Sequence, residues 1–256
     1  MKAVLKLAAG CMLFIALFSI TTPATAKVTY PKGVKWDPAP KNKYTKGRSR
    51  TIDSLIIHTT ESSSLKNTVN YFKTTSRSIS VHYLIGQNGD VVQMVDSWDT
   101  AWTQNYYNSR SIGFEMIGKA DKKSTWYYQP GDAQYGKTYN NLKPNVDKLA
   151  NICAYFIDHK LYKNGAKYKI PFQRIKGVST DYPNNTLNMP GIGGHYQIVK
   201  YKRDPGKYFP WNDLMLFISS YREHDKNIYW PKKIPEPASL AMLSLAGCLL
   251  LSRRKR

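Results

Sequence analysis

The sequence predicts an α/β domain, because short apolar runs of strand character occur together with segments of helical periodicity. Residues 54–58 form an apolar run of the length of a buried strand. Residues 81–85 and 91–95 are two β-rich runs around an Asn88-Gly89 turn, which is the pattern of a hairpin. Residues 144–161 place apolar side chains on one face of a helix. The chain has 256 residues, a length that suits one well-buried domain with additions at its ends.

The first of these additions, residues 1–26, has the three parts of a secretory signal peptide. Lys2 and Lys6 form its charged start, an apolar run follows, and Ala24-Thr25-Ala26 is a small-residue cleavage site. We therefore expect an exported protein. Cys11 follows small residues as in a lipobox, so lipoprotein processing is the alternative, although the apolar run continues well past this cysteine.

The second addition, residues 229–256, is interpreted as a linker and a sorting or anchor segment. Pro235-Glu236-Pro237 precedes an apolar run at 238–251, and four basic residues follow at 253–256. This tail resembles the PEP-CTERM sorting signal, which implies processing by an exosortase-type enzyme of a Gram-negative bacterium, and a final location in the periplasm, on the outer surface or outside the cell. The run is shorter than the about 20 residues of a stable transmembrane helix, so only transient membrane association is expected. A simple C-terminal anchor is the alternative.

Composition narrows the partners and the metal chemistry. The formal net charge of +21 favours a polyanionic partner such as an envelope polymer or anionic lipid. A nucleic-acid partner conflicts with the export signal and is not expected, whereas solubility alone is the other explanation of the charge. Of three cysteines, Cys11 lies in the signal and Cys248 in the tail, which leaves Cys153 on the apolar stripe of the 144–161 helix. Any metal in the body must therefore be held by histidine and carboxylate side chains.

Between the two ends, residues 27–50 are interpreted as an extended N-terminal arm and residues 51–228 as the domain. Within the domain, residues 65–75 have a weak helical pattern, residues 112–117 read as an interior strand, and residues 213–221 read as a closing helix.

One carboxylate and two loops stand out in the domain. Glu115 lies among apolar neighbours in a predicted interior strand, so it needs a cation, a metal-bound water or several hydrogen-bond donors nearby. Residues 119–141 are an aromatic-rich insertion, which either contacts a sugar or peptide in a cleft or packs on itself. Residues 179–194 are predicted to be a Gly- and Asn-rich loop that leads to the stretch 194–206.

That stretch offers an imidazole, an amine and a carboxylate, namely His195, Lys202 and Asp204, before a Pro-Gly turn. A catalytic zinc site needs three protein ligands and an open position, so a further ligand is expected elsewhere. The chain has five histidines: His58, His82, His159, His195 and His224. His159 and His224 fall in polar surroundings, and a histidine within a strand, such as His82, is commonly structural. His58 at a strand end remains as the best additional ligand.

Several motifs in chain order carry a family resemblance: Leu55-Ile56-Ile57-His58-Thr59-Thr60, Val81-His82-Tyr83-Leu84-Ile85 with Asn88-Gly89, Ser111-Ile112-Gly113-Phe114-Glu115, and Gly194-His195 with Lys202-Arg203-Asp204-Pro205-Gly206. Together they resemble the type-2 N-acetylmuramoyl-L-alanine amidases, which include the phage lysozyme-amidase, the muropeptide-recycling amidase and the peptidoglycan recognition proteins. The resemblance covers roughly residues 50–220. It implies a single-domain α/β fold with a central mixed β-sheet flanked by helices. We also expect a monomer.

The resemblance also implies the chemistry. His58, His195 and Asp204 would bind Zn²⁺, and Glu115 and Lys202 would be catalytic. The substrate would be peptidoglycan or muropeptides, cut at the amide between the muramic acid lactyl group and L-Ala.

The chain departs from relatives at two positions. A catalytic Tyr of some relatives is Val81 here, so Glu115 would serve as the base. The Ala-Trp-His of many relatives reads Ala101-Trp102-Thr103, which puts the expected substrate contact of that histidine in doubt. His82, Trp102 and Thr103 are the candidate substrate-binding residues. The alternative function is a non-catalytic peptidoglycan-binding module.

Overall fold

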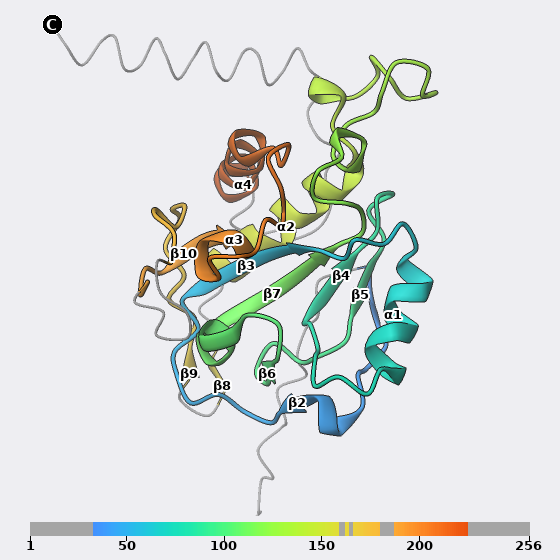
Figure 1. Ribbon diagram of the computed structural model, residues 1–256. Coiled ribbons are helices and arrows are strands. Elements are labelled where there is room, and N and C mark those ends of the chain that lie inside the picture. Colours follow the sequence, from blue (N-terminus) through green and yellow to red (C-terminus); the bar gives the residue numbers. More distant parts are fainter. Residues whose placement is uncertain (1–32, 159–161, 164–165, 180–186, 225–256) are drawn as a thin grey trace, which may run out of the picture. The chain divides into compact units, whose positions relative to one another are not determined.

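The computed structural model describes residues 33–158, 162–163, 166–179 and 187–224 (Figure 1). The predicted signal peptide and the predicted sorting tail lie outside these residues, as do the side chains of His159 and His224. Among the described residues, no helix combines the length and the apolar character that a membrane crossing requires.

The predicted α/β class and mixed sheet are confirmed. Six strands form the central sheet in the order β1-β5-β4-β7-β3-β10. Neighbours in this sheet are parallel, except that β4 and β5 form the antiparallel hairpin expected around Asn88-Gly89. The strands of this sheet are β1 (Val34–Trp36), β3 (Ser54–Thr59), β4 (Tyr83–Ile85), β5 (Val91–Gln93), β7 (Ser111–Met116) and β10 (Gly191–Gly194).

Two small two-stranded sheets and several helices complete the described chain. The small sheets pair β2 (Tyr44–Thr45) with β6 (Thr100–Ala101), and β8 (Tyr162–Lys163) with β9 (Ala166–Lys167). The α-helices are α1 (Leu65–Thr74), α2 (Pro144–Asp158), α3 (His195–Ile198) and α4 (Trp211–His224). The 3₁₀ turns are η1 (Lys41–Lys43), η2 (Asn105–Arg110), η3 (Lys123–Thr125) and η4 (Tyr139–Asn141).

Helices α1 and α2 cover opposite faces of the sheet. On β4, Leu84 belongs to the core that includes Val69 and Phe72 of α1. The preceding residue, Tyr83, packs its ring against Phe156 of α2, with centroids 5.9 Å apart. Successive side chains of a strand point to opposite faces, so the two helices lie on different sides. Helix α4 then packs on α2, as Figure 1 shows.

The central strands are buried along their whole length, since every residue of β3 and β7 is buried. Strands covered on both faces read as continuous apolar runs, which explains why these two were recognisable in the sequence. Cys153 is completely buried in α2, as its place on the apolar stripe predicted.

Two segments differ from the sequence-based expectation. Part of the region interpreted as an arm joins the structure as strands β1 and β2 rather than only lying on it. The end of the predicted 179–194 loop is strand β10, which pairs with β3. This strand is glycine-rich because its neighbours approach closely: a Cβ at Gly191 would stand 2.5 Å from the carbonyl oxygen of Gln173.

Candidate metal centre

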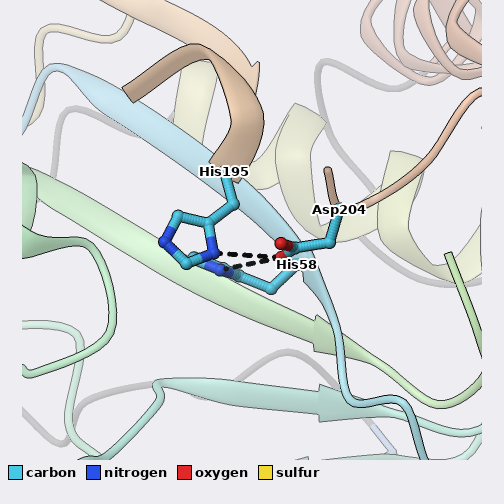
Figure 2. Close-up of side chains that lie close together, drawn as sticks. All are labelled: His58, His195 and Asp204. Carbon is cyan, nitrogen blue, oxygen red and sulfur yellow. Dashed lines mark hydrogen bonds and ion pairs between the residues drawn. The ribbon is translucent and has the colours of Figure 1, made fainter. Parts of the chain in front are cut away.

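His58, His195 and Asp204 meet at the carboxyl ends of the parallel strands (Figure 2). The Nδ1 atoms of His58 and His195 lie 3.4 and 3.1 Å from Oδ2 of Asp204. One potential ligand atom from each residue lies within 4.8 Å of the others. The three side chains predicted as metal ligands are thus brought together.

Different elements supply the three side chains. His58 is the fifth residue of the buried strand β3. His195 is the first residue of α3, directly after β10, and β10 is parallel to β3. The carboxyl ends of adjacent parallel strands share one sheet edge, which is a common location of sites in open α/β sheets.

Asp204 reaches this edge from the turn after α3. The backbone carbonyl of Asp204 accepts a hydrogen bond from the amide of Tyr196, which fixes the turn on the start of α3. Gly206 has a φ of +96°, and a Cβ there would stand 1.8 Å from the backbone oxygen of Ala120. Glycine at this position therefore allows the 204–206 turn to lie against the start of the 119–141 insertion.

The protonation states suit a divalent metal. Burial and the neighbouring His195 lower the pKa of His58 to about 4, so its imidazole is neutral at neutral pH. Burial alone would raise the pKa of Asp204, but hydrogen bonds from His195 and His58 outweigh it and hold that pKa below its usual range. Neutral imidazole and ionised carboxylate are the forms that bind metals. Two nitrogens and one oxygen are a donor set typical of zinc, so the residues fit this ion.

Glu115 lies directly beside His58, because the two residues are register partners on β7 and β3. Glu115 is 8% exposed, and its Oε2 has no hydrogen-bond partner among the described residues. Burial and the negative charge of Asp204 raise the pKa of Glu115 well above its usual range, against the opposing effect of Lys202. A carboxyl group with a raised pKa beside a metal centre is suited to accept and return a proton.

Lys202 is the exposed member of the group. It lines the same cavity of about 790 Å³ as His58, Glu115 and His195. The exposed ammonium group of Lys202 is able to reach a molecule in this cavity, whereas His58, Glu115 and His195 are buried.

The structure places His82 away from the cavity. This side chain is completely buried and does not line the cavity. Its Nδ1 accepts the amide of Gly113, and its Nε2 lies 2.7 Å from a guanidinium nitrogen of Arg48. His82 lies directly before β4 and is therefore a structural histidine that joins this part of the chain to β7 and the arm.

Trp102 and Thr103 do line the cavity, and their role in substrate binding stays a prediction. The sequence reasoning missed Arg77 and Tyr201, which also line it. Only its position next to Lys202 could have indicated Tyr201 as a cavity residue. No sequence motif indicates Arg77, which lies after the end of α1.

The 119–141 insertion does not contribute to this cavity. Trp126 is instead completely buried, and its ring contacts that of Phe209 with centroids 4.8 Å apart. The segment was expected either to contact a sugar or peptide or to pack on itself. Its most deeply buried aromatic residue, Trp126, packs inside the protein.

Comparisons with known proteins agree with this arrangement. The family model described as N-acetylmuramoyl-L-alanine amidase matches residues 48–207. N-acetylmuramoyl-L-alanine amidase A of Achromobacter lyticus is 27% identical over 187 residues, which cover 72% of this chain and 92% of the relative.

Solved structures are also similar to this chain, at lower sequence identity. The Staphylococcus aureus hydrolase AmiA, in complex with its ligand, has a TM-score of 0.50 and 14% identity, over 79% of this chain and 90% of that one. The endolysin N-acetylmuramoyl-L-alanine amidase LysCS of Clostridium intestinale has a TM-score of 0.48 and 13% identity, over 72% and 94%. Since the family model spans more than half of the chain and includes all of the converging residues, the protein belongs to the N-acetylmuramoyl-L-alanine amidase family.

Proposed function

We propose that this peptidoglycan amidase is zinc-dependent and hydrolyses the amide between the lactyl group of muramic acid and L-Ala. The observation that carries the proposal is the convergence of His58, His195 and Asp204 on one point, with Glu115 beside His58. Glu115 and the two histidines line the same cavity. The sequence motifs and the family both support this reading.

His58 and His195 through Nδ1, and Asp204 through a carboxylate oxygen, would hold the ion. Zinc would supply Lewis acidity, which lowers the pKa of water towards neutrality and polarises a carbonyl. The protein's own residues then carry the proton and stabilise the developing charge.

Glu115 takes a proton from the attacking water as the new carbon–oxygen bond forms. It returns this proton to the nitrogen of L-Ala as the carbon–nitrogen bond breaks, which leaves a lactyl carboxylic acid and a free amine. The acid then gives its own proton to the amine, so the products are a carboxylate and an ammonium group. Lys202 places its ammonium near the oxyanion that develops on the lactyl carbonyl. The raised pKa of Glu115 supports this role. A carboxylate with a higher pKa is a stronger base, so it takes the proton from water more readily and holds it until the nitrogen accepts it.

We further propose that the protein is exported, trimmed near Lys27 and processed at the Pro235-Glu236-Pro237 region by an exosortase-type enzyme. A monomer is expected. The charge of +21 supports attraction to anionic envelope polymers. Intact-mass measurement on protein from its native host tests the processing, and retention of Arg256 would reject the sorting signal in favour of a plain anchor.

Digestion of purified peptidoglycan by the zinc-loaded and the chelator-treated protein tests the activity. We expect new L-Ala amino termini and stem peptides without muramic acid only when zinc is present, as seen by mass spectrometry. A zinc-loaded protein that binds peptidoglycan but releases nothing would be a recognition module. Cleavage at another bond would reject the proposed specificity.

A further inference from the structure

A short segment upstream of the matched family region contacts two parts of the cavity wall. Residues Lys43–Thr45, here called the 43–45 segment, comprise the end of η1 and strand β2. They precede residues 48–207, which the family model covers. We propose that the 43–45 segment is a positioning element for substrate binding, and this inference rests on the proposed function of the cavity.

Lys43 holds the first part of the wall. The residue is only 6% exposed, although its side chain ends in an amino group. The Nζ atom donates hydrogen bonds to the carbonyl oxygens of Thr75 and Arg77, the latter at 2.6 Å. A buried cation is costly unless such acceptors surround it, so the contact is specific.

These two acceptors lie where the wall begins. Thr75 is the C-cap of α1, and carbonyl groups at a helix C-terminus favour a nearby cation. Arg77, the second acceptor, and the next two residues, Ser78 and Ile79, all line the cavity. Lys43 therefore fixes the backbone from which these side chains extend.

Thr45 holds the second part. Its Oγ1 accepts a hydrogen bond from the indole Nε1 of Trp102 at 3.1 Å. The backbone beneath this contact is also paired, since Tyr44 and Thr45 lie opposite Ala101 and Thr100 in the β2–β6 sheet. Trp102 lines the cavity, so its ring orientation depends on a hydroxyl group from the 43–45 segment.

The two contacts involve the cavity wall and not the proposed metal ligands or Glu115. Strands β3 and β7, helix α3 and the turn that follows carry the metal ligands and Glu115. None of these residues is hydrogen-bonded to Lys43 or Thr45 among the described contacts. Loss of the segment's contacts should therefore weaken binding, through lost pre-organisation of the wall, while kcat and zinc content remain.

The first experiment uses Thr45→Val in the full chain, because valine keeps the shape and β-propensity but removes the acceptor. We expect KM for a soluble N-acetylmuramoyl-peptide to rise about 2- to 10-fold, the range of one net hydrogen bond. The same rise is expected in the dissociation constant of the metal-free protein, measured by calorimetry. Thr51→Val, at an exposed threonine outside the cavity, is the matched control and should leave both values unchanged.

A double-mutant cycle distinguishes positioning from general damage. Phenylalanine at position 102 keeps an aromatic ring but has no indole N–H to donate. If Thr45 acts through Trp102, Thr45→Val should have no further effect on KM in the Trp102→Phe background. An equal effect in both backgrounds, an unchanged KM, or a fall in kcat at constant KM would each overturn the proposal.

Lys43→Met tests the other contact, with Lys41→Met on the exposed part of η1 as its control. We expect a higher KM and dissociation constant with unchanged zinc stoichiometry, and a lower melting temperature because two carbonyl groups lose their donor. If this variant does not fold, the Thr45 cycle decides alone. A wild-type protein that binds the peptide without cleaving it would refute the proposed function, whereas the dissociation constants would still decide the role of the segment.

Discussion

The two ends of strands β3 and β7 are built for different purposes. Directly before these strands, Asp53 and Arg110 form a two-pronged ion pair at 2.7 and 2.5 Å. Near their carboxyl ends, His58 and Glu115 lie side by side, and each has a buried polar atom without a hydrogen-bond partner among the described residues. Both ends of this strand pair thus carry polar side chains, but only those at the amino end have hydrogen-bond partners for all of their buried polar atoms among the described residues.

This difference separates stability from function. Arg110 is also held by Asn188 and stacks on the ring of Tyr107, so its charge is compensated from several sides. Unsatisfied buried groups are rare in proteins and costly, and they persist where a bound group completes them. The amino end therefore stabilises the sheet, whereas the carboxyl end has the unpaired polar atoms that the proposed metal and substrate site requires.

The largest expected effect at the carboxyl end is that of replacing Asp204. Asp204→Ala removes the carboxylate that both histidines share, so zinc binding should be lost and activity should fall by more than the about 10- to 100-fold typical of outer-shell changes. Elemental analysis and peptidoglycan digestion measure this. Asp121→Ala, in the exposed pair with Arg203, is the control and should keep zinc and activity. A zinc-replete Asp204→Ala protein would contradict the ligand set.

The second test removes the chemistry but keeps the metal. Glu115→Gln should lower kcat about 10²- to 10⁴-fold because it lacks the base, and Lys202→Ala about 10²- to 10³-fold because it lacks the cation near the oxyanion. Zinc content and peptidoglycan pull-down should match the wild type. Lys200→Ala, at a neighbouring exposed lysine, is the control. Unchanged turnover in both variants would dismiss the proposed roles.

The amino end should respond in the opposite manner. Arg110→Met leaves Asp53 without its cation, and the free energy of unfolding should fall by about 3 kcal/mol, the lower end for a broken buried pair because Asp53 is 21% exposed. Chemical denaturation measures this loss, with the exposed Arg50→Met as control. Activity per folded molecule should remain. A loss of zinc affinity at unchanged stability would show that the two ends are not separate.

The smallest expected effect is a pH-dependent gain in stability. Burial and the charge of Asp204 raise the folded-state pKa of Glu115 above its unfolded value of about 4.3. This contribution to stability is complete below the unfolded pKa and is lost as pH rises through the folded pKa. Metal-free Glu115→Gln does not lose it, so its melting temperature should exceed that of the wild type at about pH 8.

Calorimetric melting of the metal-free proteins between about pH 4 and about pH 8 measures this difference. The two proteins should melt alike near the lower limit, which serves as an internal control. A variant that melts below the wild type at the upper limit would show that the ionised Glu115 carboxylate stabilises the fold.

Local sequence patterns predicted several elements of the fold. The buried runs of β3 and β7, the Asn88-Gly89 hairpin and the amphipathic helix α2 each depend on neighbours along the chain, and all appear in the structure. Sequence spacing also placed His195, Lys202 and Asp204 in one short stretch.

Features that depend on packing were harder to predict. Strand β10 has almost no apolar side chains, and only its parallel pairing with β3 makes it a strand. His82 was a candidate for substrate contact, yet Arg48 and Gly113 enclose it. The contacts of Lys43 with Thr75 and Arg77 join residues more than 30 positions apart, beyond any local pattern.

By itself, the sequence determined the α/β class, the family and the kinds of side chain available to a metal, because periodicity, turn chemistry and motif spacing are properties of neighbouring residues. Only the tertiary structure decided that Glu115 lies opposite His58, that His82 is buried and that the 43–45 segment contacts residues of the cavity wall. Register between parallel strands and contacts between distant segments follow from how buried faces pack together, and that packing is a property of the whole fold.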